Sequence, residues 1–214
     1  MTSARLRIWS DRACFTRPDL KVERVSYEVI TPSAARGVLE AIYWKPQMRW
    51  VIERVHVLKP IRFESIYRHE VRNRTSAQAV IRSARRRSVE GLDLVIEAER
   101  QQRSSVVLRD VAYVLDARIE LSAEAPAGAT VTEHLSRFRR RVRRGQCFHR
   151  PYMGVREFAL DFELQDGDPP PAEALAGERD LGWMLLDIDF SDDMRPQFFR
   201  AVLRDGVLTP PAAA

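Results

Sequence analysis

Alternating hydrophobic and polar residues mark several short segments of the chain as strands that bury one face. Residues 4–10 alternate from the first position, and residues 49–58 alternate in the same way. A period of two is typical of a strand with one side toward the core. Residues 106–121 form a longer run rich in β-branched side chains. We predict strands at residues 4–10, 49–58, 61–67, 106–121, 155–164, 181–190 and 198–208, with Asp205-Gly206 as a turn signal.

A first helix is predicted to begin at the Thr31-Pro32 pair. Proline suits the first position of a helix, because its fixed φ is helical and the first N–H groups have no partner within the helix. The helix should run to Tyr43 or Trp44 and end before Pro46, since the residue that precedes a proline is biased away from helix. We expect a polar loop over residues 11–23, before this helix.

A second helix is predicted over residues 131–144, where hydrophobic residues recur at spacings of four, three and four. This spacing places them on one helical face. Thr130 and Glu133 have the spacing of a capping box at its start, and Gly145 marks its end. The hydrophobic face consists of Val131, Leu135, Phe138 and Val142.

The segment between the third and fourth predicted strands has no single pattern. A short helix fits residues 77–84, whereas the polar stretches 82–87 and 99–105 are typical of solvated loops. We therefore expect a mobile basic insertion or hairpin over about residues 68–104.

The predicted order β-α-β-β-α-β is that of a ferredoxin-like unit, so the fold class is α+β, similar to an RNA-recognition motif. We expect residues 1–166 to form this domain. A proline-containing linker then leads into a small antiparallel β extension, so that residues 167–214 form a second, acidic part.

Composition narrows the cellular setting. The chain has 214 residues, of which 45% are hydrophobic, enough for one core of its own. It has no apolar run near the roughly 20 residues of a membrane span, and its first residues lack a signal-peptide core. Cys14 and Cys147 form no CxxC motif. We expect a cytoplasmic, reduced protein without a membrane partner.

Charge is segregated along the chain. Residues 1–150 hold 30 basic and 17 acidic residues, a net charge of +13, whereas residues 151–214 hold 5 arginines and 13 acids, a net charge of −8. Arginine-rich codon usage explains arginine in place of lysine, but it does not explain this segregation. A basic body with an acidic end favours a nucleic-acid ligand and a separate partner surface.

The second predicted helix carries six arginines within residues 137–144. Like charges at this density repel one another unless a polyanion lies nearby. His134 lies one turn before Arg137 and two turns before Arg141. This combination suggests a site for a phosphate backbone, although a solvated helix face remains the alternative. The arginines in question are Arg137, Arg139, Arg140, Arg141, Arg143 and Arg144.

Six motifs, in order along the chain, resemble the type I-C CRISPR-associated Cas-five family (the Dvulg subtype). They are AIYWKP (41–46), VLKPIRFESI (57–66), LRDVAYV (108–114), GQCFHRPYMGVREF (145–158), LLDIDF (185–190) and FFRAVLRDGVL (198–208). The resemblance implies a ferredoxin-like fold with a small extra sheet. It also implies an endoribonuclease that cuts precursor CRISPR RNA within each repeat without metal or cofactor. Such a protein stays on the 5′ handle, with backbone and large subunits of a surveillance complex as its partners.

The resemblance also implies site residues. A family tyrosine falls on Tyr43 and a family histidine on His134, both implicated in cutting. The resemblance further implies a lysine at the position that holds Glu133 in this chain. Alternatives from the residues alone are that His134 decorates an exposed helix, that Tyr43 is a packed ring, and that Glu133 serves only the helix cap.

The RNA-binding residues are expected around the second helix and the loop after it. Phe148, Tyr152, Phe15 and Trp44 are candidates to stack on bases, or equally core residues. Cys147 and His149 form only a C-x-H pair, too few ligands for a metal site, so no metal is expected. The RNA-binding set is Lys45, Arg137, Arg139, Arg140, Arg141, Arg143, Arg144, His149 and Arg150.

Three functions are compatible with these features. The first is a metal-independent endoribonuclease that also remains as a subunit, and the second is a binding and assembly subunit that does not cut, which Glu133 favours. The third, a basic regulator with no CRISPR role, has no reader motif in its support.

Overall fold

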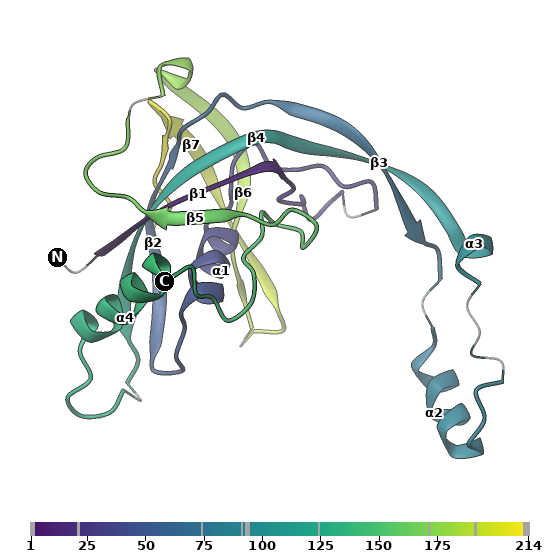
Figure 1. Ribbon diagram of the computed structural model, residues 1–214. Coiled ribbons are helices and arrows are strands. Elements are labelled where there is room, and N and C mark those ends of the chain that lie inside the picture. The colour runs from purple at the N-terminus through teal and green to yellow at the C-terminus, as the bar shows by residue number, and fades with distance from the viewer. Residues whose placement is uncertain are drawn as a thin grey trace.

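The structure, a computed structural model, describes residues 3–20, 22–73, 75–90, 92, 95–123, 125–170, 172–190 and 192–211. Parts of the predicted insertion (74, 91, 93 and 94) and one residue of the predicted linker (171) lie outside the described residues. Within them the chain has a mixed α/β fold with one antiparallel sheet and few helices (Figure 1). No described helix is long and apolar enough to cross a lipid bilayer.

The helices and strands occur in the predicted order with some changes of length. The strands are β1 (Ser3–Ala13), β2 (Met48–Val57), β3 (Phe63–Val71), β4 (Arg100–Leu121), β5 (Asp161–Leu164), β6 (Glu178–Asp189), β7 (Arg195–Arg204) and β8 (Val207–Leu208). The helices are α1 (Pro32–Ile42), α2 (Ala77–Arg86), α3 (Ile96–Glu99), α4 (Val131–Arg143) and the 3₁₀ turn η1 (Glu173–Leu175). The two predicted main helices and the strands over 4–10 and 49–58 are confirmed.

One sheet runs in the order β5-β1-β4-β2-β8-β7-β6, and β3 pairs with β4 outside this path. The paired strands are antiparallel, with Leu6 opposite Leu115 and Val55 opposite the same residue from the other side. The 22 residues of β4 explain this layout. Its second half lies between β1 and β2 at the centre of the sheet, and its first half continues outward with β3.

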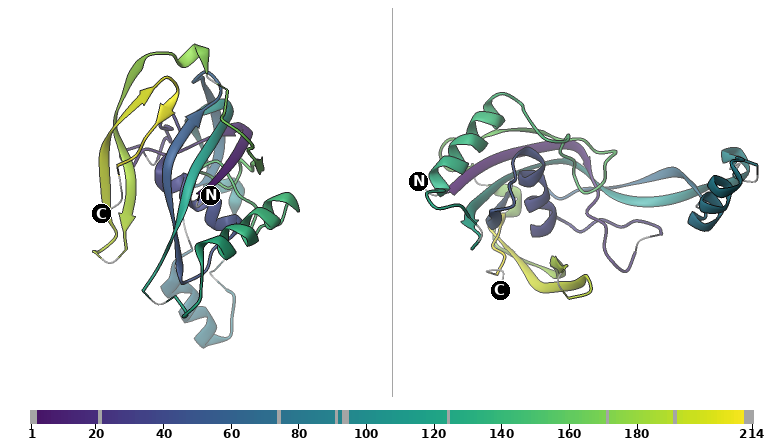
Figure 2. Two further views of the ribbon diagram at one scale, coloured as in Figure 1. Left: turned by 90° about the vertical axis from the view of Figure 1, so that its left-hand side faces the viewer. Right: turned by 90° about the horizontal axis from the view of Figure 1, so that it is seen from below.

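The outer half of β4 and its partner β3 form an arm that leaves the body and ends in α2 (Figures 1 and 2). Phe63 to Val71 pair in register with Leu108 to Arg100. The predicted hairpin is therefore confirmed, but the predicted loops are wrong: residues 82–86 belong to α2, and residues 100–105 belong to β4. Cross-strand hydrogen bonds make a strand of a polar sequence that has no hydrophobic period.

Two further strand predictions need correction. Residues 155–160 are turns and an isolated bridge, so the strand predicted from 155 begins only at Asp161. The predicted loop over 11–23 begins later, because β1 continues to Ala13. The Asp205-Gly206 turn is confirmed: both residues have positive φ, and they separate β7 from β8.

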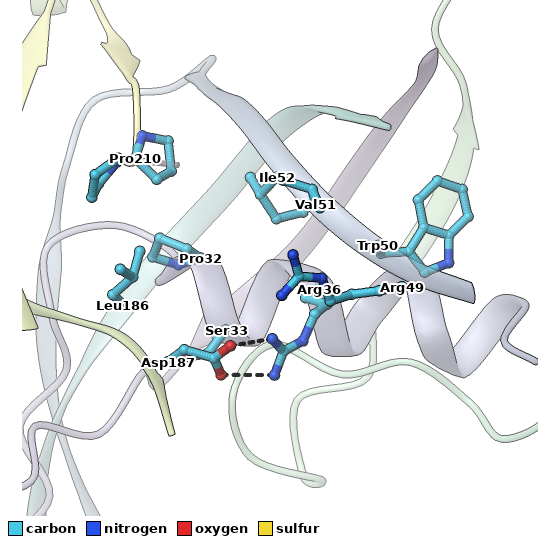
Figure 3. Close-up of a pocket in the computed structure, with 11 residues that line it drawn as sticks. Pro32, Ser33, Arg36, Arg49, Trp50, Val51, Ile52, Leu186, Asp187 and Pro210 are labelled. Atoms are coloured by element: carbon cyan, nitrogen blue, oxygen red, sulfur yellow. Dashed lines mark hydrogen bonds and ion pairs between the residues drawn. The ribbon is translucent and has the colours of Figure 1, made fainter. Parts of the chain in front are cut away.

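The main hydrophobic core joins the sheet, α1, α4 and the C-terminal strands. Leu6 and Ile8 of β1 are fully buried, and Trp50 of β2 meets Phe138 of α4 edge to face at 4.8 Å between ring centroids. Helix α1 also contacts the C-terminal strands. Its Arg36 forms an ion pair with Asp187 of β6 through two contacts, one of which measures 2.7 Å (Figure 3). The β6–β7 ribbon is therefore fixed against α1, whose last residue leads into the candidate site.

Candidate functional site

Tyr43 is positioned by the way α1 ends. It is the C-cap residue, with extended backbone angles (φ −154°, ψ 120°), and its N–H donates to the carbonyl of Leu39 at 2.9 Å. Its own carbonyl accepts a hydrogen bond from the indole N–H of Trp50 at 2.8 Å. Two hydrogen bonds therefore hold the backbone of this residue, and only 5% of the residue is exposed.

His134 lies in the first turn of α4. Thr130 caps this helix, and its Oγ1 accepts a hydrogen bond from the N–H of Glu133 at 3.3 Å. The hydrophobic face predicted for the helix packs inward at Leu135, Phe138 and Val142, and His134 is buried on this side with 3% exposure. The alternative that His134 decorates an exposed helix surface is therefore wrong.

The structure brings the two predicted catalytic residues together. The Tyr43 hydroxyl lies 2.8 Å from Nδ1 of His134, and both groups are buried. When the hydroxyl accepts from Nδ1–H, the lone pair of Nε2 is left to take a proton. When the hydroxyl donates to Nδ1, Nε2 carries the hydrogen and becomes a donor. One hydrogen bond thus couples the role of the imidazole to the hydroxyl of Tyr43.

The charges around His134 favour the neutral imidazole. Burial lowers the pKa of His134 below its ordinary value, and the positive charges of Arg137 and Lys45 lower the pKa further, whereas Glu133 opposes them. The lowered pKa leaves the ring uncharged at neutral pH, the form that can accept a proton.

Glu133 has a different partner from the one that its spacing predicts. In a complete capping box its carboxylate would accept from the backbone N–H of Thr130. Instead it forms an ion pair with Arg137 one turn later, so only the Thr130 half of the box is present. The carboxylate of Glu133 therefore offsets the charge of Arg137.

The arginines of α4 fall into two groups. Arg139 and Arg141 are half-buried: Arg139 donates to the carbonyl of Ser3 at 3.0 Å, and Nε of Arg141 is buried without a hydrogen-bond partner among the described residues. The exposed group consists of Arg137, which pairs with Glu133, of Arg140 and Arg143, and of the C-cap residue Arg144.

The loop after α4 is held against α1. Gly145 ends the helix with φ +61°, as predicted, and the N–H of Phe148 donates to the carbonyl of Ala41 at 2.7 Å. His149 is exposed, and Arg150 is paired with Asp161 at 2.5 Å. Lys45 and this loop therefore lie at the same end of α1, beside the Tyr43–His134 pair.

Sequence patterns did not single out Gly154. Its φ is +82°, and a Cβ there would lie 2.1 Å from the carbonyl oxygen of Cys14, so only glycine fits. Next to it, the N–H of Cys14 donates to the carbonyl of Met153 at 3.0 Å. The only sequence signal was the residue type itself, since the contact is with a residue 140 positions earlier in the chain.

The four candidate stacking residues separate clearly. Phe15 is 3% exposed and meets Tyr113 edge to face, so of its two alternatives the core position is confirmed. Trp44 and Phe148 are 51% and 87% exposed, and Tyr152 is half-buried. Within the described part of the chain, no group of three or more His, Cys, Asp or Glu side chains is arranged to hold a metal ion.

Comparison with known proteins places the chain among the CRISPR-associated proteins: a family model described as "CRISPR-associated protein (Cas_Cas5)" matches residues 4–211. The matching model is that of Cas5d, and the chain belongs to this family. A relative from Mannheimia succiniciproducens, named CRISPR pre-crRNA endoribonuclease Cas5d, is 53% identical over 211 residues, which cover 97% of this chain and 94% of the relative. A Thermus thermophilus protein of the same name is 38% identical, with 99% and 93% covered.

Solved structures agree on the fold. A structure described as that of a CRISPR-associated protein superposes with a TM-score of 0.71 at 20% identity, covering 98% of this chain and 92% of the other. A functionally uncharacterized Streptococcus mutans protein, SMU1763c, gives a TM-score of 0.67 at 21% identity, again with 98% and 92% covered. The family model and the two Cas5d relatives confirm the resemblance noted in the sequence at the level of the family.

Proposed function

We propose that this protein is a pre-crRNA endoribonuclease. It cuts precursor CRISPR RNA within the repeat without metal or cofactor, and it then stays on the 5′ handle as a subunit of a type I-C surveillance complex. The observation that carries the catalytic part is the hydrogen bond between Tyr43 and Nδ1 of His134. The names of the two Cas5d relatives support the substrate.

The nucleophile in this proposal belongs to the RNA. The 2′-hydroxyl beside the cut attacks the adjacent phosphorus, the bond to the 5′ oxygen breaks, and this leaving oxygen takes a proton from water. The products therefore carry a 2′,3′-cyclic phosphate and a 5′-hydroxyl. His134, neutral because its pKa is lowered, takes the 2′-hydroxyl proton at Nε2 while Tyr43 holds Nδ1–H. Lys45 and Arg137 stabilise the negative charge that grows on the phosphate oxygens.

Binding of the RNA rests on the basic surface beside this pair. The exposed arginines of α4 contact phosphates without reading sequence, which makes affinity dependent on salt. Arg139 and Arg141 are partly buried and shape this surface from beneath. Partners of the complex, its backbone and large subunits, bind elsewhere, and the protein acts in the cytoplasm. The remaining members of the proposed RNA-binding set are Lys45, His149 and Arg150.

We further propose that residues 1–166 form a ferredoxin-like domain and residues 167–214 an acidic extension. The strand order β5-β1-β4-β2, with α1 and α4 as the crossovers, supports the first part. The second part adds β6, β7 and β8 to the edge of the same sheet and contributes Leu181 and Met184 to the shared core.

A second candidate function is an assembly subunit that grips the handle but does not cut. Two points support it: Tyr43 and His134 are 5% and 3% exposed, and the resemblance implies a lysine where this chain has Glu133. In that case the hydrogen bond serves only to fasten α1 to α4.

One experiment separates the two functions. The purified protein is incubated with its own repeat RNA in EDTA, and the products are resolved on a denaturing gel and treated with a cyclic-phosphate-opening phosphatase. Cleavage to a 2′,3′-cyclic end, lost in His134→Gln, supports the endoribonuclease. Tight binding without any cleavage in EDTA or in added Mg²⁺ supports the assembly subunit. Cleavage only with Mg²⁺ contradicts the proposed mechanism.

A further inference from the structure

A hollow of about 450 Å³ opens between α1 and the loop after α4. One wall is a face of α1, where residues spaced by three and four positions lie in a row. The other wall is the loop 148–154. The residues that give the hollow its shape and charge are Gly37, Glu40, Trp44, Phe148, His149 and Tyr152.

Aromatic rings on both walls are exposed. Phe148 is 87% exposed and Trp44 is 51% exposed. Large apolar rings left in water are commonly part of a surface that a ligand or partner covers. The loop rings are arranged against one another: His149 stacks on Tyr152 at 6.2 Å and 28°, and Phe148 meets His149 edge on at 6.0 Å. They therefore present flat faces in fixed directions.

The loop wall is anchored at both ends. At one end, the N–H of Phe148 donates to Ala41 of α1 at 2.7 Å. At the other, Gly154 packs so closely on the Cys14 carbonyl that no side chain fits. A site preorganised in this way loses little entropy when it binds a flat ligand.

The helix wall is kept open by Gly37. Glycine within a helix is less favourable than any other residue except proline. A Cβ at Gly37 would meet no atom within 4 Å, so packing within the chain does not require glycine there. The absence of a side chain instead leaves the space of the hollow free.

The charges select the kind of ligand. Among the described residues that line the hollow there is no lysine or arginine, and there is one carboxylate, Glu40. A phosphate group inside would meet that carboxylate, which is paired with Arg36 of the same helix, and would find no lysine or arginine among the described lining residues. Just outside, Lys45 comes directly after Trp44 in the chain, and the arginine helix α4 leads into the loop. An aromatic interior with cations at its margin fits a nucleobase inside and its phosphates outside.

We propose that the hollow between α1 and the loop binds unpaired nucleobases of the repeat RNA, stacked on Phe148 and Trp44. This base site rests on the proposed function, since it assumes an RNA ligand that passes the Tyr43–His134 pair. Stacking on aromatic side chains is the usual way in which proteins hold single-stranded bases. The site then fixes the strand beside the cut, while the arginines supply affinity.

The test uses the full-length protein and its repeat RNA, compared with the same RNA carrying one abasic residue at each unpaired position in turn. An abasic residue keeps the phosphate and removes the base. We expect Phe148→Ala to weaken binding of the normal RNA by roughly 5- to 150-fold, the equivalent of about 1–3 kcal/mol for one stacked base. At the position that stacks, the abasic RNA should bind equally to wild type and Phe148→Ala, with an unchanged salt slope.

Gly37 supplies a second, independent variant. Gly37→Leu fills the hollow from the helix side and should reduce RNA affinity to a similar extent. Ala174→Leu, which adds a leucine at an exposed position of η1 in the C-terminal extension, is its control: it should melt at about the same temperature and bind RNA like wild type. Because both changes lie in open space, a folding failure is not expected to obscure the result.

The outcomes separate the base site from the proposed function. Equal RNA affinity of wild type, Phe148→Ala and Gly37→Leu overturns the base site, even if the protein cuts its repeat. If Phe148→Ala binds the normal RNA more weakly than wild type does, but binds the abasic RNA equally well, the base site is supported, even if the protein proves not to cut. Normal RNA binding by Phe148→Ala together with lost assembly of the complex overturns it as well, because it assigns the hollow to a protein partner.

Discussion

The hydroxyl of Tyr43 lies 2.8 Å from Nδ1 of His134, although 91 positions separate the two residues. One residue ends α1 and the other belongs to the first turn of α4. The contact therefore depends on how the two helices pack, and any change in that packing changes the hydrogen bond. It also makes both residues sensitive reporters of function and of stability.

The Tyr43–His134 hydrogen bond can be tested by removing one atom. Tyr43→Phe should slow cleavage and should also lower the free energy of unfolding by about 1–3 kcal/mol, because a buried imidazole nitrogen loses its partner. His134→Gln should slow cleavage by about 10²- to 10⁴-fold, as expected when a general base is lost. Single-turnover rates and denaturant unfolding measure the two effects.

A matched control is Tyr67→Phe, the same change at a ring on the arm that is 72% exposed. It should alter neither rate nor stability. Normal cleavage by both Tyr43→Phe and His134→Gln would remove the pair from the mechanism and leave it a purely structural contact.

The pKa of His134 predicts a dependence on pH. Burial, together with Arg137 and Lys45, lowers the folded-state pKa below the unfolded value of about 6.5. As the pH falls below about 6.5, the unfolded chain binds the proton first, so this contribution to stability is present above that pH and is lost below it. Thermal melts from pH 7.5 to 5 should show a larger loss for wild type than for His134→Gln.

The rate should depend on the same group. If neutral His134 is the base, kcat/KM should decline on acidification with an apparent pKa below 6.5. A rate that instead rises as the pH falls from 7.5 to 6 would contradict the role of base and indicate that the protonated ring acts.

The exposed arginines of α4 should dominate non-specific affinity. We expect Arg140→Ala, Arg143→Ala and Arg144→Ala together to weaken binding to repeat and scrambled RNA alike, and to reduce the log–log salt slope by about 0.7 for each lost phosphate contact. Arg139 is left in place, because it donates to the Ser3 carbonyl and its loss would also affect folding.

The control removes three positive charges from the β6–β7 ribbon instead. Arg179→Ala, Arg195→Ala and Arg204→Ala lie on β6 and β7 and should leave the slope unchanged. Equal slopes for the two triple variants would mean that RNA does not bind along α4.

Glu133→Lys introduces the lysine that the resemblance implies at this position. It removes the ion pair that offsets Arg137 and adds a cation beside His134, so we expect a faster cut. The cost in stability should be small, about 0.3–0.5 kcal/mol for a surface helix pair, because the Thr130 cap uses the backbone N–H and is retained. Single-turnover assays and thermal melts measure both. If the wild-type protein never cuts its repeat RNA and the Glu133→Lys variant does, the result would favour the assembly-subunit function for the wild-type protein.

Gly154 should be intolerant of any side chain. Gly154→Ala requires a non-glycine residue at φ +82° and a Cβ 2.1 Å from the Cys14 carbonyl oxygen. We expect a loss of about 1–3 kcal/mol in unfolding free energy, and weaker RNA binding because the loop moves. Gly37→Ala is the contrasting control, with an expected gain of about 0.5–1 kcal/mol. If Gly154→Ala and Gly37→Ala changed the unfolding free energy by the same amount, the positive φ and close contact of Gly154 would not determine the position of the loop.

Local signals in the sequence were sufficient for much of the fold. The period of two identified β1 and β2, and the spacing of Leu135, Phe138 and Val142 identified α4, because these patterns depend on which side chains must leave water. The run of arginines identified α4 as the basic helix, because a charge run is likewise a property of one segment. The family resemblance supplied Tyr43 and His134, which periodicity alone left open.

Tertiary structure decided what depends on contacts between distant segments. Residues 100–105 are polar, yet they form a strand because β3 supplies their hydrogen-bond partners. Residues 155–160 are apolar enough for a strand, yet they turn, close to the Gly154–Cys14 contact. His134 is buried, and a hollow exists between α1 and the loop, because two helices separated by about 90 residues pack together. A pattern within one segment fixes which face of it is apolar, but only the neighbouring segment determines what that face contacts.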